Sequence, residues 1–153
     1  MAHPPRIPVL LPLDHRVTWF LTFCVQPRRP VLACPEVWTA FRAAIERLRD
    51  WQAAAAVLMP DHIHVLARPL REREQPVGNL SGALKRWTRE PFRERWEWQP
   101  GSFDRLLRAD ESAQQKWEYI WQNPVRAGLV TDPDAWPYWF AESEIAPANP
   151  RPL

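Results

Sequence analysis

Glycine, cysteine and long apolar runs are all scarce in this sequence. Only four of its 153 residues are glycine, against 18 prolines and 10 tryptophans. The two cysteines, Cys24 and Cys34, form no Cys-x-x-Cys pair and lack the spacing of metal ligands, so we expect reduced thiols and a cytoplasmic protein. No apolar run reaches the roughly 18 residues that a membrane span requires. The composition therefore predicts a soluble protein that is neither secreted nor embedded in a membrane.

Charge and chain length set further bounds. Lys and Arg number 20 against 18 Asp and Glu, a mildly basic balance that permits a polyanionic partner without requiring one. A chain of this length suits one domain. Prolines crowd both ends, so we expect an N-terminal arm over 1–13, a folded domain over 14–140 and a C-terminal tail over 141–153 without packed structure.

Hydrophobic periodicity predicts the order of strands and helices. Alternation with a period of two indicates strands, and apolar residues three or four apart indicate helices. On this basis we expect strands over 16–25, 53–59, 62–70 and 102–107, and helices over 35–51, 79–90 and 111–122. Asp110 could cap the last helix, and Pro124 should end it. The order β-α-β-β-α-β with a third helix predicts a ferredoxin-like α+β sandwich, an antiparallel sheet with helices packed on one face.

The segment MPDHIHVL (59–66) carries a pair of histidines one residue apart. In a strand, His62 and His64 point to the same face while Ile63 and Val65 point to the other. The two imidazoles could then converge on a metal ion. They could equally well form only hydrogen bonds at the sheet surface, and the pair by itself favours neither interpretation.

The last predicted helix offers a partner for this pair. Tyr119 and Asn123 fall on its polar face, one turn apart. Alternatively, the tyrosine only fills an amphipathic face and the asparagine only ends the helix. If this face packs against the histidine strand, two imidazoles and an amide oxygen suit Mg²⁺ or Mn²⁺ with open positions for phosphate oxygens. A phenol near a phosphodiester that a metal polarises could act as a nucleophile.

Basic and aromatic residues alternate in LKRWTREPFRERWEW (84–98). Cations bind phosphates and ring faces stack on unpaired bases, so this segment suggests a nucleic-acid surface. The alternative is a solvated helix face with its aromatics in the core. The candidate DNA-binding residues are Arg28, Arg29, Lys85, Arg86, Arg89 and Arg126.

Several of these segments resemble a known family. MPDHIHVL resembles the HUH motif of single-tyrosine transposases of the insertion-sequence-200-like superfamily. YIWQNPVRAGLV resembles the tyrosine-bearing helix of their REP-associated branch, and TWFLTF, WQPGSFDRLLR and AWPYWF also look like that branch. The resemblance covers about residues 14 to 140.

The resemblance implies a specific chemistry. A divalent metal, Mg²⁺ or Mn²⁺, would be held by the positions that match His62, His64 and Asn123. Tyr119 matches the nucleophile, which would attack single-stranded DNA beside a palindromic REP hairpin to give a 5′-phosphotyrosine and a free 3′-hydroxyl. An aromatic position common in the family is Phe103 here, so we expect a one-tyrosine enzyme. The resemblance further implies a nucleoid-associated protein that is a monomer or a homodimer.

Two other functions fit the same residues. A non-catalytic hairpin-DNA binding protein or repressor would use the basic and aromatic segment without chemistry. A small metallohydrolase would use activated water and would tolerate the loss of Tyr119.

Overall fold

The computed structural model describes residues 11, 16–108 and 111–153. The predicted N-terminal arm lies outside the described residues apart from Leu11, and so does Asp110, the expected helix cap. Among the helices of the described residues, none combines the length and the apolar character that a membrane crossing requires.

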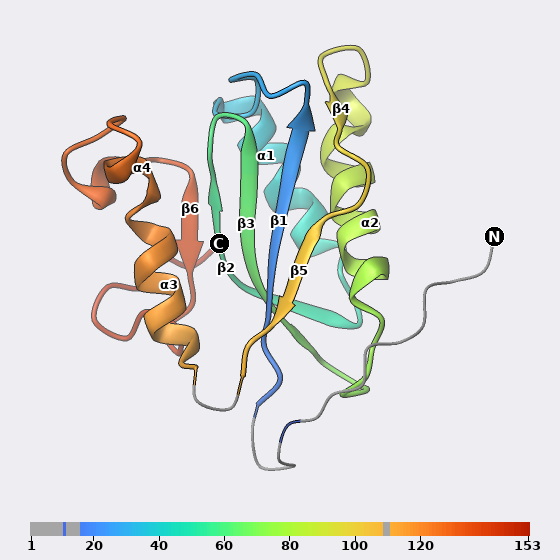
Figure 1. The fold of residues 1–153 in the computed structure, drawn as a ribbon, viewed down its shortest axis with the longest axis vertical. Helices are drawn as coiled ribbons and strands as arrows, with labels where there is room; N and C mark the ends of the chain where they lie inside the picture. Colours follow the sequence, from blue (N-terminus) through green and yellow to red (C-terminus); the bar gives the residue numbers. More distant parts are fainter. Residues whose placement is uncertain (1–10, 12–15, 109–110) are drawn as a thin grey trace.

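The chain folds into an antiparallel sheet with helices, which confirms the predicted α+β class (Figure 1). The sheet order is β4-β1-β3-β2-β6, and β5 also pairs with β1. The strands are β1 (Trp19–Gln26), β2 (Trp51–Leu58), β3 (His62–Pro69), β4 (Glu97–Trp98), β5 (Phe103–Leu106) and β6 (Trp139–Ala141). The helices are α1 (Pro35–Glu46), α2 (Val77–Arg89), α3 (Ala113–Trp121) and α4 (Asn123–Arg126), with 3-10 turns at Glu90–Phe92 and Pro133–Ala135.

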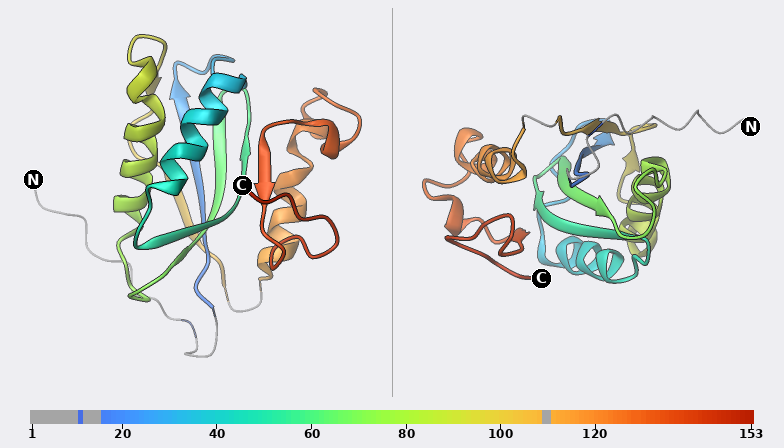
Figure 2. Two further views of the ribbon diagram at one scale, coloured as in Figure 1. Left: turned by 180° about the vertical axis from the view of Figure 1, so that it is seen from behind. Right: turned by 90° about the horizontal axis from the view of Figure 1, so that it is seen from below.

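Helices α1 and α2 cover one face of the sheet (Figure 2, left). The alternation of β1 places Trp19, Leu21 and Phe23 on this face, where they pack against residues such as Phe41 and Leu84 of the two helices. Helix α1 is shorter than predicted and ends at Glu46, because Trp51 already pairs with Pro69 at the start of β2. This layer is the larger of the two hydrophobic cores.

Helix α3 packs on the opposite face, so the helices are not confined to one side of the sheet. Trp117 and Ile120 of α3 are buried against Val57 and Leu66, whose side chains point away from α1 and α2. Trp139 of β6 joins this second core. The sequence predicted neither β6 nor β4, because strands of two or three residues are too short to show a period.

The last predicted helix is α3, and the short helix α4, which the sequence did not predict, follows it directly. Ser112 caps α3 by accepting a hydrogen bond from the backbone N–H of Gln115 at 3.3 Å. The helix ends at Trp121, and Asn123 opens the short helix α4 with Pro124 in its first turn. Proline is well tolerated at that position because its missing N–H would have no partner there.

The C-terminal segment, expected to lack packed structure, packs onto the second core. Ile145 is only 1% exposed, and Ala141 pairs with Arg151 through two backbone hydrogen bonds. The Arg151 guanidinium lies 3.9 Å from the ring centre of Trp139. A segment rich in proline shows no helical or strand period, so its packing follows from contacts with α3 and β6 that the local sequence does not reveal.

Replacing Ile145 by alanine tests whether this segment is part of the folded domain. We expect Ile145→Ala to lower the free energy of unfolding by about 2–5 kcal/mol, the usual cost of truncating a buried aliphatic side chain. Urea denaturation measures the change, and Pro147→Ala, at an exposed position nearby, is the control. An Ile145→Ala midpoint equal to that of the control would contradict the observed packing.

Candidate active site

The two histidines lie on the face of the sheet that α3 covers. Strand β3 is paired on both sides, with Thr22 of β1 and Val57 of β2 both opposite His64. The imidazole centroids of His62 and His64 are 4.7 Å apart, with their planes at 76°. The prediction that the pair shares one face, opposite the buried Ile63, is confirmed.

Each imidazole is oriented by a hydrogen bond at Nδ1. His62 Nδ1 lies 2.7 Å from a carboxylate oxygen of Asp61, and His64 Nδ1 lies 2.8 Å from the hydroxyl oxygen of Thr22. Neither Nε2 has a hydrogen-bond partner among the residues that the structure describes. A partner at one ring nitrogen fixes the other as the possible metal ligand.

Arg28 reinforces this arrangement through Asp61. Its Nε donates to Asp61 at 2.9 Å, and its Nη2 lies 3.3 Å from His62 Nδ1. Because Nδ1–H of a neutral His62 donates to the carboxylate, the guanidinium acts on the imidazole by holding Asp61. Burial by itself would raise the pKa of Asp61, but the hydrogen bonds from Arg28 and His62 outweigh it and lower that pKa.

Both imidazoles are neutral at pH 7. Burial lowers the pKa of His62, although the hydrogen bond to Asp61 opposes the change. Burial, together with repulsion from protonated His62 and from the positive charges of Lys116 and Arg126, lowers the pKa of His64 to about 3. Neutral imidazole is the form that binds metals.

Tyr119 projects from α3, the helix that packs on the histidine face of the sheet. Its side chain is 62% exposed, and the Arg126 guanidinium carbon lies 4.1 Å from the centre of its ring. Lys116 lies 4.5 Å from the ring centre of Phe20, which in turn is 5.2 Å from the His64 ring. The chain of contacts from Lys116 through Phe20 joins the tyrosine helix to the histidine face.

The sequence placed Asn123 on the same helix as Tyr119, whereas the structure places it at the start of α4, and its amide oxygen has a partner. Arg126 donates to Asn123 Oδ1 and, at 2.6 Å, to the backbone oxygen of Tyr119. Among the described residues, no group of three or more His, Cys, Asp and Glu side chains could hold a metal ion. His62 and His64 could supply only two nitrogen ligands to a metal ion, and a third ligand would have to come from outside those residue types.

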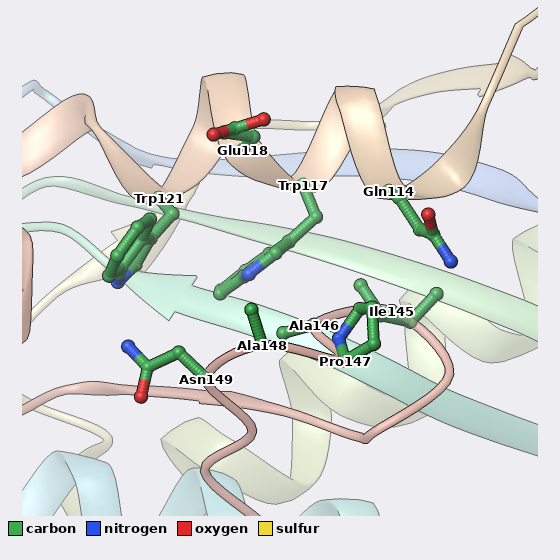
Figure 3. Close-up of a pocket in the computed structure, with 9 residues that line it drawn as sticks. All are labelled: Gln114, Trp117, Glu118, Trp121, Ile145, Ala146, Pro147, Ala148 and Asn149. Carbon is green, nitrogen blue, oxygen red and sulfur yellow. The ribbon is translucent and has the colours of Figure 1, made fainter.

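The side of α3 that carries Trp117 and Trp121 packs against the C-terminal segment (Figure 3). Trp117 and Trp121 point from the helix towards residues 145–149, and a cavity of about 240 Å³ lies between them. The rings of Trp117 and Trp121 are 5.9 and 5.7 Å from that of Trp139. This packing fixes the rotation of α3 about its axis and so directs Tyr119 to the opposite side.

Lys85 and Arg89, two of the candidate DNA-binding residues, have partners within the protein. Lys85 donates to the backbone oxygens of Gln99, at 3.0 Å, and Gly101, and burial lowers its pKa. Arg89 donates to the backbone oxygen of Trp96 and pairs with Glu97 at 2.5 Å. Both side chains attach the segment 93–101 to α2.

The other candidate cations are exposed. Arg28 contacts Asp61 beside the histidines, and Arg29 donates to the backbone oxygen of Arg95 at 3.1 Å. Arg86 lies on α2, over the helix-covered face of the sheet, whereas Arg126 lies at Tyr119. The six candidates therefore do not form one continuous surface around the histidines.

The sequence interpretation missed three residues that shape this site. Thr22 orients His64, Asp61 orients His62, and Lys116 places a charge near both Phe20 and Tyr119. A signal existed for the first two, because Thr22 is a polar residue on the histidine face of β1 and Asp61 directly precedes the pair. Nothing in the sequence marked Lys116.

Two curated relatives resemble the chain. It is 25% identical over 131 residues to the REP-associated tyrosine transposase of Escherichia coli (strain K12), covering 84% of this chain and 79% of that protein. A relative from Haemophilus influenzae is 24% identical over 136 residues, covering 78% of this chain and 77% of that protein. No family model matches. The resemblance to REP-associated tyrosine transposases is therefore confirmed.

A solved structure supports the same fold. The structure of a REP-associated tyrosine transposase bound to a REP hairpin has a TM-score of 0.68 and 22% sequence identity. The match covers 91% of this chain and 82% of that one. The ferredoxin-like arrangement predicted from the sequence is confirmed by this similarity.

Replacing Lys85 separates a structural role from DNA contact. We expect Lys85→Ala to lower the free energy of unfolding by about 1–3 kcal/mol, because two backbone oxygens lose a charged donor. The matched control is Arg86→Ala, at the exposed next position, which should change stability by less than about 0.5 kcal/mol. Equal effects of the two variants in urea denaturation would contradict the internal role of Lys85.

Proposed function

We propose that this protein cleaves and rejoins single-stranded DNA beside a hairpin, as an HUH endonuclease and strand transferase with Tyr119 as its nucleophile. The observation that carries the proposal is an exposed phenol on α3 that Lys116 and Phe20 link to two neutral imidazoles, each oriented through Nδ1. The resemblance to transposases supports DNA processing, and the related structure bound to a REP hairpin supports hairpin DNA as the partner.

The bonds that form and break in the covalent step belong to the phenol and a phosphodiester. The Tyr119 oxygen forms a bond to phosphorus, the bond from phosphorus to the 3′-oxygen breaks, and a 5′-phosphotyrosine results. The phenol loses its proton and the leaving 3′-oxygen gains one, so protons and electrons balance. Attack of a 3′-hydroxyl on the phosphotyrosine reverses the step and rejoins strands.

His62 and His64 fit a divalent metal ion as nitrogen ligands through Nε2, and we propose Mg²⁺ or Mn²⁺. Asn123 would add its amide oxygen once Arg126 releases it. Such an ion, when bound, polarises a phosphodiester and stabilises the charge that develops on its oxygens. Arg126 would then be free to contact a phosphate next to Tyr119. The same side chain would thus bind Asn123 in the free protein and DNA in the complex.

The surroundings of the site suit an extended single strand. Arg28 contacts Asp61 beside His62, and Arg126 contacts Tyr119; both are exposed, and exposed cations attract the phosphate backbone. We propose Arg29 and Arg86 as contacts to more distant phosphates. Monomer and homodimer are both compatible with this proposal, and association with the nucleoid stays a prediction.

Formation of a covalent adduct tests the role of Tyr119. Wild-type protein, hairpin DNA with a single-stranded extension and Mn²⁺ should yield an adduct that withstands denaturing electrophoresis. Tyr119→Phe should abolish the adduct, because the nucleophilic oxygen is missing. Tyr138→Phe removes the only other tyrosine and should leave it unchanged.

The remaining outcomes separate the other functions. An adduct from Tyr119→Phe would disprove the assignment. Cleavage without an adduct in that variant would instead indicate a metallohydrolase. Salt-sensitive hairpin binding with neither nick nor adduct in the wild type would favour a non-catalytic binding protein, for which the bond between Arg126 and Asn123 is the specific supporting observation.

The hydrogen bond that His64 Nδ1–H donates to the Thr22 hydroxyl oxygen predicts a second, independent result. Removing the group that orients a ligand commonly weakens metal binding 10–100-fold, so Thr22→Val should weaken Mn²⁺ binding by about that factor. Electron paramagnetic resonance of free Mn²⁺ measures this without any DNA. Thr39→Val, at an exposed position of α1, is the control, and an unchanged affinity in Thr22→Val would rule out His64 as a ligand oriented in this way.

A further inference from the structure

Phe103 is a large aromatic side chain that the fold leaves in the solvent. It is 67% exposed, although it lies within β5 and not in a loop. The sheet register places it directly opposite Thr22 of β1, which itself lies opposite His64. The three side chains therefore form one row on the histidine face of the sheet, and Phe103 lies about 10 Å from His64, two strand spacings away.

A small cavity adjoins this row. Its volume is about 130 Å³, and it is lined by Thr22 and Cys24 of β1, by residues 99–102 and by Phe103. Because one water molecule occupies about 30 Å³ in the liquid, the cavity could take the edge of one planar ring but not a whole nucleotide. Thr22 belongs both to this cavity and to the hydrogen bond that orients His64.

Hydrogen bonds to β1 and α2 hold one wall of the cavity, the segment 99–101, in place. The backbone N–H of Gln99 donates to the Cys24 oxygen at 2.8 Å, and Lys85 binds the backbone oxygens of Gln99 and Gly101. Gly101 has a φ of +73°, a conformation that favours glycine. These internal hydrogen bonds and this backbone conformation fix the shape of the wall.

Polar groups at the cavity suit the edge of a base. The exposed Gln99 side chain has no hydrogen-bond partner among the described residues, and its amide can both donate and accept. The Ser102 hydroxyl donates to Asp104 at 2.7 Å, which leaves its oxygen able to accept. A ring face beside an amide is the combination that binds an unpaired base.

We infer that Phe103 and the adjoining cavity bind one unpaired base of the single-stranded DNA, within a nucleotide or two of the phosphate at the histidines. The inference rests on the proposed function, because it takes that strand as its ligand. Phe103 supplies the stacking face, and Gln99 contacts the edge of the base. The pair would thus set which base is accepted beside the cleaved bond.

Fluorescence of 2-aminopurine tests the inference in protein that cannot react. The probe is hairpin DNA with a six-nucleotide single-stranded extension, placed on the 5′ or the 3′ side, with 2-aminopurine at each extension position in turn. In the Tyr119→Phe background with EDTA, we expect quenching at one position. Phe103→Ala and Phe103→Leu should both remove that quenching and weaken binding about ten-fold, whereas Phe103→Trp should retain it.

Two controls make the result specific. Leu70→Ala, another exposed apolar side chain, should have no effect. An abasic site at the quenched position should weaken binding of the parent protein by about the same factor and should remove the effect of Phe103→Ala. If Phe103→Leu binds and quenches as the parent does, or if the abasic site leaves the effect of Phe103→Ala unchanged, stacking on Phe103 is disproved.

The two proposals fail in different ways. Absence of an adduct in the wild type would overturn strand transfer and leave the quenching result standing. An adduct that forms normally, without quenching that depends on Phe103, would overturn the base site alone. A change in sedimentation of Phe103→Ala without any change in quenching would assign the side chain to a contact between copies of the protein, and would also overturn the base site.

Discussion

The antiparallel pairing of β1 with β3 is the constraint on which the rest of the structure depends. It places Thr22 opposite His64 and Cys24 opposite His62, and it puts Ile63 and Phe23 into the core on the other face. A slip of one residue would exchange the two faces of a strand. It would bury the imidazoles and expose the apolar residues, so the free energy that stabilises the core also fixes the direction of the two histidines.

Helix α3 is positioned by the same sheet, but it packs on the face that carries the histidines, away from α1 and α2. The helix buries Trp117 and Ile120 against β2, β3 and β6, and that burial determines where Tyr119 points. Tyr119 itself contributes little to packing, because it is 62% exposed. The candidate nucleophile and the candidate ligands therefore come from separate elements, which the hydrophobic core aligns.

Much of this arrangement could be predicted from periodicity. The alternation in β1 and β3 indicated which face carries the histidines, and the tryptophan stripe of α3 separated Tyr119 from the buried side of its helix. What could not be predicted depends on contacts between distant segments. The packing of Ile145 and the inward direction of Lys85 leave no local pattern, because these side chains find their partners by proximity in the fold. The bond from Arg126 to Asn123 joins residues three apart, but the sequence does not show which acceptor a long arginine side chain selects.

The most direct test of the central claim is a peptide map of the DNA adduct. The chain has only two tyrosines, and trypsin places Tyr119 in the fragment 117–126 and Tyr138 in a different fragment. After digestion of protein and DNA, mass spectrometry should find a nucleotide joined through its 5′-phosphate to residues 117–126, with the other fragment unmodified. A nucleotide on the Tyr138 fragment, or none on either fragment while the DNA is cleaved, would contradict the account.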